Sequence, residues 1–243
     1  MRKMKSKKLK TILSITGYFL LAVALCFTAG LVFHSYYYQA IYVSGISMMP
    51  TLYGQTEDKD GATVDFGIMD THSIALNNLK RFDIISTYYP KDYDDSGTLK
   101  ASATKKIKRI VAMPGEEFKI ENGVLSVKEN GVYKQYDYPC KIETTNVKDT
   151  QQTLVENEYW VLGDNRTHSN DSASSEVGAI KKEYIIGKLV AIEGRATLKL
   201  KNYVCDFCGQ TSKTNSVCSR CGSVFFTKNF DLKNKVYHWP KYY

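Results

Sequence analysis

Residues 42–51 read YVSGISMMPT, and the central question about this stretch is the role of Ser47. The serine stands two positions after a glycine and is followed by two methionines and a Pro-Thr pair. Serine among such residues is most often part of a turn. A serine hydroxyl becomes a nucleophile only beside a general base and beside donors that stabilise the oxyanion it creates. The surrounding sequence therefore decides between a turn residue and a nucleophile.

The positive charge of the chain is concentrated in its first ten residues. The 243 residues carry a formal charge of +8, and six Lys or Arg residues lie in MRKMKSKKLK (1–10), which contains no acid. The other residues are close to electrical neutrality. Nucleic-acid binding normally requires a basic patch on a folded surface. We therefore expect no nucleic-acid partner.

An uncharged segment follows this basic cluster. Residues 11–33, TILSITGYFLLAVALCFTAGLVF, contain 23 residues without a charge. As a helix they would span about 35 Å, enough to cross a hydrocarbon core of about 30 Å. A cleavable signal peptide is the alternative, but its apolar region is usually only about 7–15 residues long. We predict a single-pass anchor in the lipid of the cell membrane, with 1–10 cytoplasmic and everything after residue 34 extracytoplasmic.

The chain beyond the apolar segment is predicted to be mainly β. Short β-branched and aromatic runs, such as RFDIISTYY (81–89) and IKRIVAM (107–113), alternate with turn signals such as ENG and MPG. No long helical period competes with them, so residues 34–200 are expected to form an all-β domain of catalytic size. The polar stretches 58–67 and 90–106 are interpreted as surface loops.

Two side chains are candidates for the base that Ser47 needs. His168 lies in GDNRTHSNDS (163–172), near Asp164 and Asp171, so a Ser-His-Asp triad is conceivable. The alternative interpretation of this histidine is a solvated loop residue. A triad and a lysine base both remain open at this point.

The lysine candidate is Lys108, at the start of an apolar strand. Strand alternation predicts that it shares a face with Ile110 and Ala112. If that face is covered, desolvation disfavours the ammonium form and lowers the pKa from about 10.4, which produces a general base near neutral pH. In the alternative, Lys108 keeps its amine in water.

Four ordered stretches resemble one enzyme family. SGISMMPTL (44–52), KRIVAMPGE (108–116) and GDNRTHSNDS (163–172), behind an apolar segment, resemble the motifs of type I signal peptidases. RFDIIST (81–87) is similar to a short strand motif of that family, with Phe82 where a glycine is usual. The resemblance implies a membrane-anchored serine endopeptidase that removes signal peptides from exported preproteins by a Ser–Lys dyad, without a cofactor.

The resemblance also implies roles for individual residues. Ser47 would be the acylating nucleophile and Lys108 its base. Ser169 matches the serine that hydrogen-bonds the lysine amine, and Gly45 stands where some members carry a second serine that helps the oxyanion hole. The remaining implied supporting residues are Asp171, Asp164 and Arg166.

Three positions near these residues depart from the family pattern. Thr167 and His168 stand where Asp-Asn is common, and Ala173 replaces an arginine that usually pairs with the acid matching Asp171. The nucleophile and base assignments do not depend on these positions.

Apolar residues beside the dyad are expected to line a shallow slot. A slot of this kind suits the small side chains of Ala-x-Ala cleavage sites. The substrate is expected to lie extended and to pair along an edge strand. The predicted lining residues are Met48, Leu52, Ile107 and Val43.

The composition changes in the tail, which we assign to 201–243. CDFCGQTSKTNSVCSRCG contains two CxxCG units, the spacing of a zinc ribbon. Disulfides are the alternative on the extracytoplasmic side. The expected zinc ligands are Cys205, Cys208, Cys218 and Cys221, and the tail is expected to stabilise the domain or contact a protein partner. Cys26 and Cys140 are interpreted as packing residues.

Two other functions compete with the peptidase. The related self-cleaving repressors also use a Ser–Lys dyad, but they would need a DNA-binding head where this chain has an apolar segment. A non-catalytic membrane-anchored scaffold that binds protein through its zinc ribbon is the alternative from another class.

Overall fold

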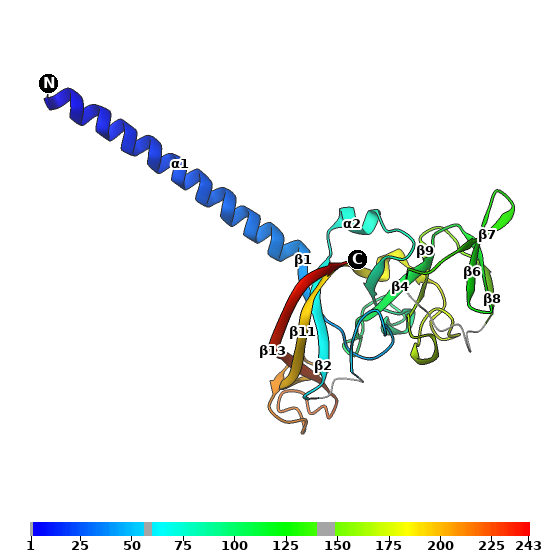
Figure 1. The fold of residues 1–243 in the computed structure, drawn as a ribbon. Helices are drawn as coiled ribbons and strands as arrows, with labels where there is room; N and C mark the ends of the chain where they lie inside the picture. Colours follow the sequence, from blue (N-terminus) through cyan, green and yellow to red (C-terminus); the bar gives the residue numbers. More distant parts are fainter. Residues whose placement is uncertain (1, 56–59, 140–148) are drawn as a thin grey trace. The chain divides into compact units, whose positions relative to one another are not determined.

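The computed structural model describes residues 2–55, 60–139 and 149–243, so Cys140 lies outside the described residues. The chain divides into two compact units between Gln39 and Ala40. The first unit is dominated by one helix, α1 (Arg2–Tyr37), drawn in blue in Figure 1. Its window Ser14–His34 has a mean hydropathy of 2.1 and buries none of its residues, and no other described helix is long and apolar enough to cross a membrane. This window fits a membrane anchor.

The second unit is built from two antiparallel sheets, which confirms the mainly β prediction (Figure 1). The larger sheet has the strand order β1-β2-β11-β3-β4-β9-β10, with β12 and β13 also paired to β11. Its strands are β1 (Tyr38–Tyr42), β2 (Thr63–Asp70), β3 (Ile84–Thr87), β4 (Lys106–Ala112), β9 (Glu158–Leu162), β10 (Ile180–Lys181), β11 (Ile185–Cys205), β12 (Thr211–Ser212) and β13 (Phe226–Tyr242). The smaller sheet has the order β7-β6-β5-β8, formed by β5 (Glu117–Glu121), β6 (Val124–Glu129), β7 (Val132–Tyr136) and β8 (Thr150–Thr153).

Short helical elements lie between these strands. The α-helix α2 follows β2, and three 3₁₀ turns mark the loops after β3, β9 and β10. Their bounds are α2 (Ser73–Asn77), η1 (Pro90–Asp92), η2 (Arg166–His168) and η3 (Lys182–Tyr184). The stretch 90–106, predicted to be a loop, contains no strand until Lys106 begins β4.

Strand β4 contributes to two apolar clusters, and this explains one difference from the predicted pattern. Ile110 packs with Ile85 and Val161, whereas Ala112 packs with Phe118 in another cluster. The pairing of β4 with β9 shifts register between Ile110 and Ala112. A bulge of this kind turns the following side chain to the other face. The expectation that Ala112 shares a face with Ile110 is therefore wrong.

The stretch 58–67 is partly a strand and not the predicted loop. β2 begins at Thr63 and pairs with β11, and Val64 and Phe66 are buried. Asp65, one of the polar residues of this stretch, is buried, and its carboxylate accepts hydrogen bonds from the Tyr53 amide (2.6 Å) and the Arg195 guanidinium (2.8 Å). A paired acid loses little on burial, so the β-branched and aromatic residues beside it determine the structure.

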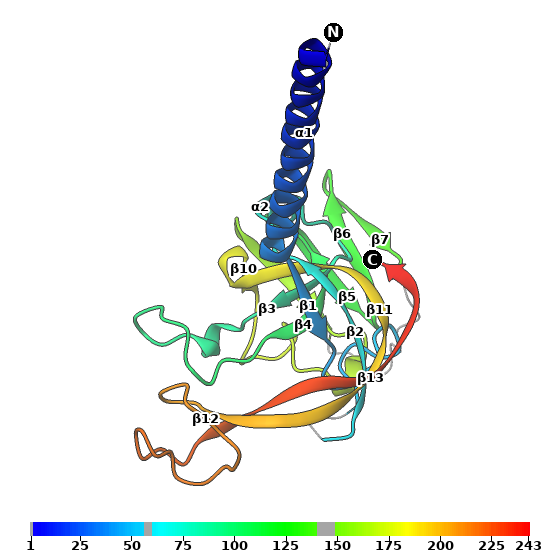
Figure 2. The same cartoon turned by 90° about the vertical axis from the view of Figure 1, so that its left-hand side faces the viewer.

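The tail forms a long strand that returns along β11. The β11–β13 pairing runs from Cys205 opposite Phe226 to Ala191 opposite Tyr242. Figure 2 shows the two strands side by side, with β12 and the orange loops at one end of the hairpin. Strand pairing thus continues across residue 200, while the division into a catalytic domain and a tail at this position stays a prediction.

Candidate active site

Ser47 lies in the loop between β1 and β2, and apolar packing fixes this loop. Met48 and Leu52 are 1% and 0% exposed and belong to one core cluster. The Leu52 amide donates to the Met48 carbonyl at 2.9 Å, and the Met49 amide donates to the Ile46 carbonyl at 3.1 Å. Ser47 itself is half-buried. The buried side chains of Met48 and Leu52 therefore anchor a loop that leaves Ser47 partly accessible.

Lys108 lies on β4, and its side chain extends to Ser47. Its Nζ lies 2.9 Å from Ser47 Oγ and 3.0 Å from the Ile107 carbonyl oxygen. The residue is only 3% exposed, and this burial lowers the pKa of the amine from 10.5 to about 8, although the Asp171 carboxylate opposes the shift. A hydroxyl within hydrogen-bonding distance of an amine of this pKa is the arrangement that an activated nucleophile needs.

His168 does not reach Ser47. It is exposed, and its Nδ1 lies 2.8 Å from the Thr167 hydroxyl. Among the described residues, the only side chain hydrogen-bonded to Ser47 Oγ is Lys108. The geometry therefore does not assemble the alternative triad.

Asp164 is held by a residue that the sequence reasoning did not assign. Arg109 Nε and Nη2 donate to the two Asp164 carboxylate oxygens at 2.9 and 2.7 Å, and both side chains are buried. Arg109 Nη1 also donates to the Phe82 carbonyl at 2.8 Å. The Arg109 guanidinium thus connects three parts of the site: Asp164 in the segment after β9, its own strand β4, and Phe82 in the loop before β3. An arginine directly after Lys108 in an apolar strand is the feature of the sequence that could have indicated a buried partner for an acid.

The segment after β9 also contacts the loop that carries Ser47. The Asn165 amide donates to the Ser47 carbonyl at 3.0 Å, and its side chain donates to the Ile46 carbonyl at 3.2 Å. The buried Tyr89 hydroxyl donates to the Asn170 carbonyl at 2.6 Å. Asn165 and Tyr89 are positioning residues that no motif argument selected.

Asp171 accepts backbone hydrogen bonds in place of a side-chain partner. Its carboxylate oxygens accept from the Gly163 amide at 2.8 Å and from the Ala173 amide at 3.2 Å. Asp171 is buried, and its negative charge lies close enough to raise the pKa of Lys108. Position 173 carries alanine and no arginine, so the Asp171 carboxylate is held by the backbone amides of Gly163 and Ala173.

Neither Ser169 nor Arg166 forms a hydrogen bond to Ser47 or Lys108 among the described residues. Ser169 Oγ is buried and, within the described parts of the chain, has no hydrogen-bond partner; the expected bond to Lys108 is not formed in this structure. Arg166 places its guanidinium 4.9 Å from the centre of the Tyr138 ring. Arg166 therefore stacks on the domain surface rather than contacting the dyad.

The backbone around Ser47 includes a glycine in the left-handed region and one amide without an acceptor in the part of the chain that the structure describes. Gly45 has a φ of +80° and donates its amide to the Gln55 carbonyl at 3.1 Å, and the space where its Cβ would stand is open. The Ser47 amide donates to no acceptor within the described residues. A free amide on the nucleophile is the usual donor to the tetrahedral oxyanion in acyl transfer.

The sequence comparisons identify the family to which this arrangement belongs. The family model described as signal peptidase, peptidase S26, matches residues 14–193. The chain belongs to the signal peptidase S26 family. It is therefore a serine peptidase and a hydrolase. The match ends well before the cysteine-containing tail.

Individual relatives are similar over most of their length. The chain is 30% identical over 188 residues to signal peptidase I U of Bacillus subtilis (strain 168), covering 75% of this chain and 87% of that protein. Signal peptidase I of Bacillus caldolyticus is 29% identical over 180 residues, with 69% and 84% covered. A crystal structure of a signal peptidase I from Enterococcus faecalis is 27% identical, with a TM-score of 0.33, and covers 46% of this chain and 97% of that one.

The apolar residues expected to line the slot of this peptidase differ in exposure. Val43, Met48 and Leu52 are all 2% exposed or less and form the interior of one cluster. Ile107 packs against the same cluster while remaining partly exposed. Within the predicted set, Ile107 is thus the only side chain that is partly exposed.

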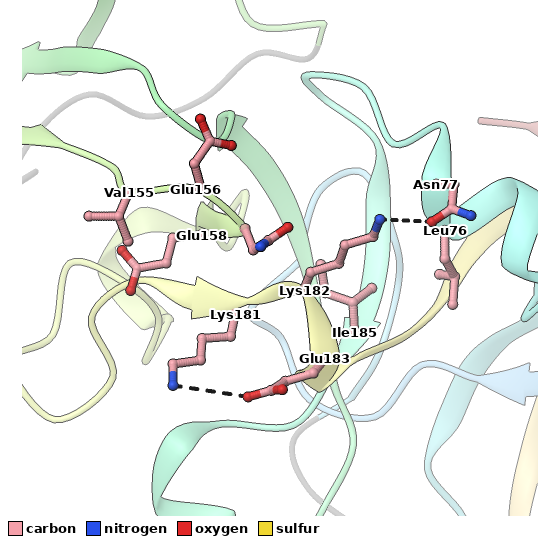
Figure 3. A pocket seen from close by; sticks show the side chains of 10 residues that line it. Leu76, Asn77, Val155, Glu156, Glu158, Lys181, Lys182, Glu183 and Ile185 are labelled. Atoms are coloured by element: carbon pink, nitrogen blue, oxygen red, sulfur yellow. Dashed lines mark hydrogen bonds and ion pairs between the residues drawn. The ribbon is translucent and has the colours of Figure 1, made fainter.

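A separate open pocket of about 710 Å³ lies away from this site. Figure 3 shows its lining, in which Lys182 reaches Asn77 at 2.8 Å and Lys181 approaches Glu183 at 4.0 Å. None of the lining residues is a serine, cysteine or histidine. The pocket therefore offers no nucleophile of the kind that the peptidase chemistry requires.

The four tail cysteines converge on one point. Their sulfurs all lie within 4.8 Å of one another, with Cys205 and Cys221 at 3.5 Å and Cys208 and Cys218 at 3.6 Å. These separations exceed a disulfide bond of about 2.05 Å and approach the edge of about 3.8 Å expected for a tetrahedron of sulfurs around zinc.

The two CxxCG units have the same backbone geometry. The Gly209 amide donates to the Cys205 carbonyl at 2.9 Å, and the Gly222 amide donates to the Cys218 carbonyl at 2.8 Å. Both glycines have a positive φ, which explains the glycine after each unit. Backbone amides directed at the Cys205 and Cys218 sulfurs lower the pKa of both thiols. Four sulfurs on two matched turns fit a tetrahedral zinc.

Proposed function

We propose that this peptidase removes signal peptides from exported preproteins, with Ser47 as nucleophile and Lys108 as general base. The observation that carries the proposal is the 2.9 Å separation of the two side chains in a site where the lysine is almost fully buried. Membership of the signal peptidase family supports the substrate class. A scaffold without catalysis would not need an amine kept out of water.

The proposed reaction proceeds through an acyl-enzyme. The neutral Lys108 amine takes the proton of the Ser47 hydroxyl while Oγ attacks the scissile carbonyl carbon. The resulting ammonium returns the proton to the leaving amine as the peptide C–N bond breaks. Water then attacks the ester carbonyl while the Lys108 amine accepts its proton. The ammonium returns this proton to Ser47 Oγ as the ester C–O bond breaks, which releases the product acid and restores both Ser47 and the neutral amine.

The pKa of Lys108 determines how much enzyme is competent for this step. With a pKa of about 8, about a quarter of the amines are neutral at pH 7.5, compared with about 0.1% for an ordinary lysine. Burial therefore increases the population of the base by roughly two orders of magnitude.

The other site residues are proposed to support this pair. Ile107 contacts an extended substrate, above a floor formed by Val43, Met48 and Leu52. The Ser47 amide, beside the open backbone at Gly45, stabilises the oxyanion. The proposed structural supports are Asp164, Asp171, Arg166 and Ser169.

Membrane anchoring is the second part of the proposal. Helix α1 would cross the membrane once, with the basic residues before it on the cytoplasmic side and the catalytic unit outside. Its apolar window Ser14–His34 supports the crossing, and the six Lys or Arg residues of 1–10 support the orientation. The anchor would hold the peptidase where signal peptides emerge, which raises the local concentration of substrate.

A structural zinc in the tail is the third part. Cys205, Cys208, Cys218 and Cys221 would hold it as four thiolates, and their spacing and matched turns support a tetrahedral ion. The ion would stabilise the fold of the tail and would supply no chemistry to the peptidase site.

The test is cleavage of one secretory precursor by the full chain in detergent micelles. Ser47→Ala and Lys108→Ala should each abolish cleavage while circular dichroism remains unchanged, and His168→Ala should cleave at the wild-type rate. Activity retained by Lys108→Ala and lost by His168→Ala would reject the dyad in favour of the triad.

A further inference from the structure

The strand β13 carries an aromatic residue into the cluster beneath Ser47. Tyr242 pairs with Ala191 at the end of the β11–β13 ladder, and the next amide, that of Tyr243, donates to the Val190 carbonyl at 3.0 Å. Tyr243 packs against the cluster that contains Met48 and Leu52. The tail thus reaches the nucleophile loop, although the family match ends at residue 193.

The contact also includes a hydrogen bond to the loop itself. The Tyr243 hydroxyl donates to the Thr51 carbonyl at 3.3 Å. Thr51 lies four residues after Ser47, at the end of the turn closed by the Leu52 amide and the Met48 carbonyl. Tyr243 therefore holds the end of the loop opposite to the side held by Asn165, whose amide donates to the Ser47 carbonyl.

The neighbouring tyrosine provides a natural contrast. Tyr242 is 73% exposed, whereas Tyr243 is half-buried. Successive side chains of an extended strand point in opposite directions, so only the second ring can reach the loop. The contact is consequently specific to one position of the tail.

We propose that Tyr243 is a positioning residue for Ser47: through its ring and its hydroxyl it fixes the end of the nucleophile loop, and so keeps Ser47 in line with Lys108. The inference rests on the proposed function, because it assigns the tail a role in the same reaction. Tyr243 touches neither substrate nor the reacting atoms. The tail would in this way contribute to catalysis by holding the loop rather than by adding chemistry.

The first test measures the loop without any substrate. Hydrogen exchange of the full chain in micelles reports the peptide that covers residues 44–53, including the bonded amides of Met49 and Leu52. Tyr243→Ala should speed this exchange about tenfold, the factor that about 1.4 kcal/mol produces. Tyr242→Ala should leave it unchanged, and Tyr243→Phe, which keeps the ring, should restore most of the protection.

The second test measures catalysis on the folded protein. Tyr243→Ala should lower kcat about tenfold with little change in KM, since small displacements of reacting groups slow the chemical step. Tyr243→Phe should recover most of the rate, and the fluorescence of buried Trp160 checks that folding is intact. If Tyr243→Ala does not fold, the comparison of Tyr243→Leu with Tyr242→Leu decides, and faster exchange with a lower kcat in the first alone supports the inference.

Equal exchange of residues 44–53 in the two alanine variants would overturn the inference, as would equal kcat. A faster unfolding rate or lower stability alone, with exchange of this peptide and kcat unchanged, would also reject it, because a merely structural contact behaves in that way. Failure of the wild type to cleave any precursor would reject the proposed function, and the exchange experiment would still decide the role of Tyr243.

Discussion

Gly163 lies where the segment after β9 packs closely against the backbone of Ser47. A methyl group added at position 163 should therefore disrupt the site. A Cβ at position 163 would lie 2.5 Å from the Ser47 carbonyl oxygen and would also collide with the Ser169 side chain. Ordinary contact begins at 3.4 Å, so one of the two backbones must move by about 0.9 Å. A misplacement of about 1 Å in a catalytic group costs about 100-fold in rate. We therefore expect Gly163→Ala to lower kcat/KM about 100-fold.

The assay is cleavage of a secretory precursor by the full chain, with the free energy of unfolding measured in parallel. Overpacking should cost about 1–3 kcal/mol of stability, which leaves the domain folded. Gly187→Ala is the matched control, because it adds the same methyl at a buried position of β11 where the nearest heavy atom is 3.1 Å away. Adding Ser169→Ala should not rescue Gly163→Ala, since the Ser47 carbonyl remains in the way. Wild-type kcat/KM in Gly163→Ala would refute the reasoning.

Three further predictions concern stability and metal content. Asp164→Ala should lower the free energy of unfolding by about 3–5 kcal/mol in denaturant titration, because it leaves the buried Arg109 charge unpaired; a loss below 1 kcal/mol would contradict this. Phe82 has a φ of +72°, so Phe82→Gly should be more stable than Phe82→Ala by about 1 kcal/mol, and the opposite order in thermal unfolding would show that the backbone conformation carries no strain. Elemental analysis should find one zinc per chain, chelation should lower the melting temperature, and Cys218→Ser should make melting insensitive to the chelator; a metal-free tail with no free thiols would exclude the site.

Local patterns were sufficient for the mainly β class and for the apolar helix, because both depend on hydropathy and residue type along the chain. They failed where a distant partner decides the outcome. The polar stretch 58–67 was interpreted as a loop. The part of it that forms β2 can be buried because the Arg195 guanidinium and the Tyr53 amide bind the Asp65 carboxylate. Ala112 lies on the opposite face from the one predicted, because a bulge in the β4–β9 pairing shifts the register before it.

The proposed dyad was predicted from ordered motifs, but its supports were not. Arg109, Asn165 and Tyr89 act through hydrogen bonds to groups far away in sequence, so no spacing rule selects them. The tail was interpreted only as a cysteine module. The long ladder with β11, which brings Tyr243 to the nucleophile loop, depends on register between strands and has no signature in either strand alone.

The proposed mechanism requires Lys108 to be an uncharged base at working pH, and a titration of this one side chain measures whether it is. Lysine labelled with ¹³C at Cε would be followed by NMR in the full chain, with Lys108→Arg used to assign the signal. We expect a pKa of about 8 for Lys108, so that the neutral amine increases as the pH rises through this value. A Lys108 signal that titrates near 10.5 would contradict it.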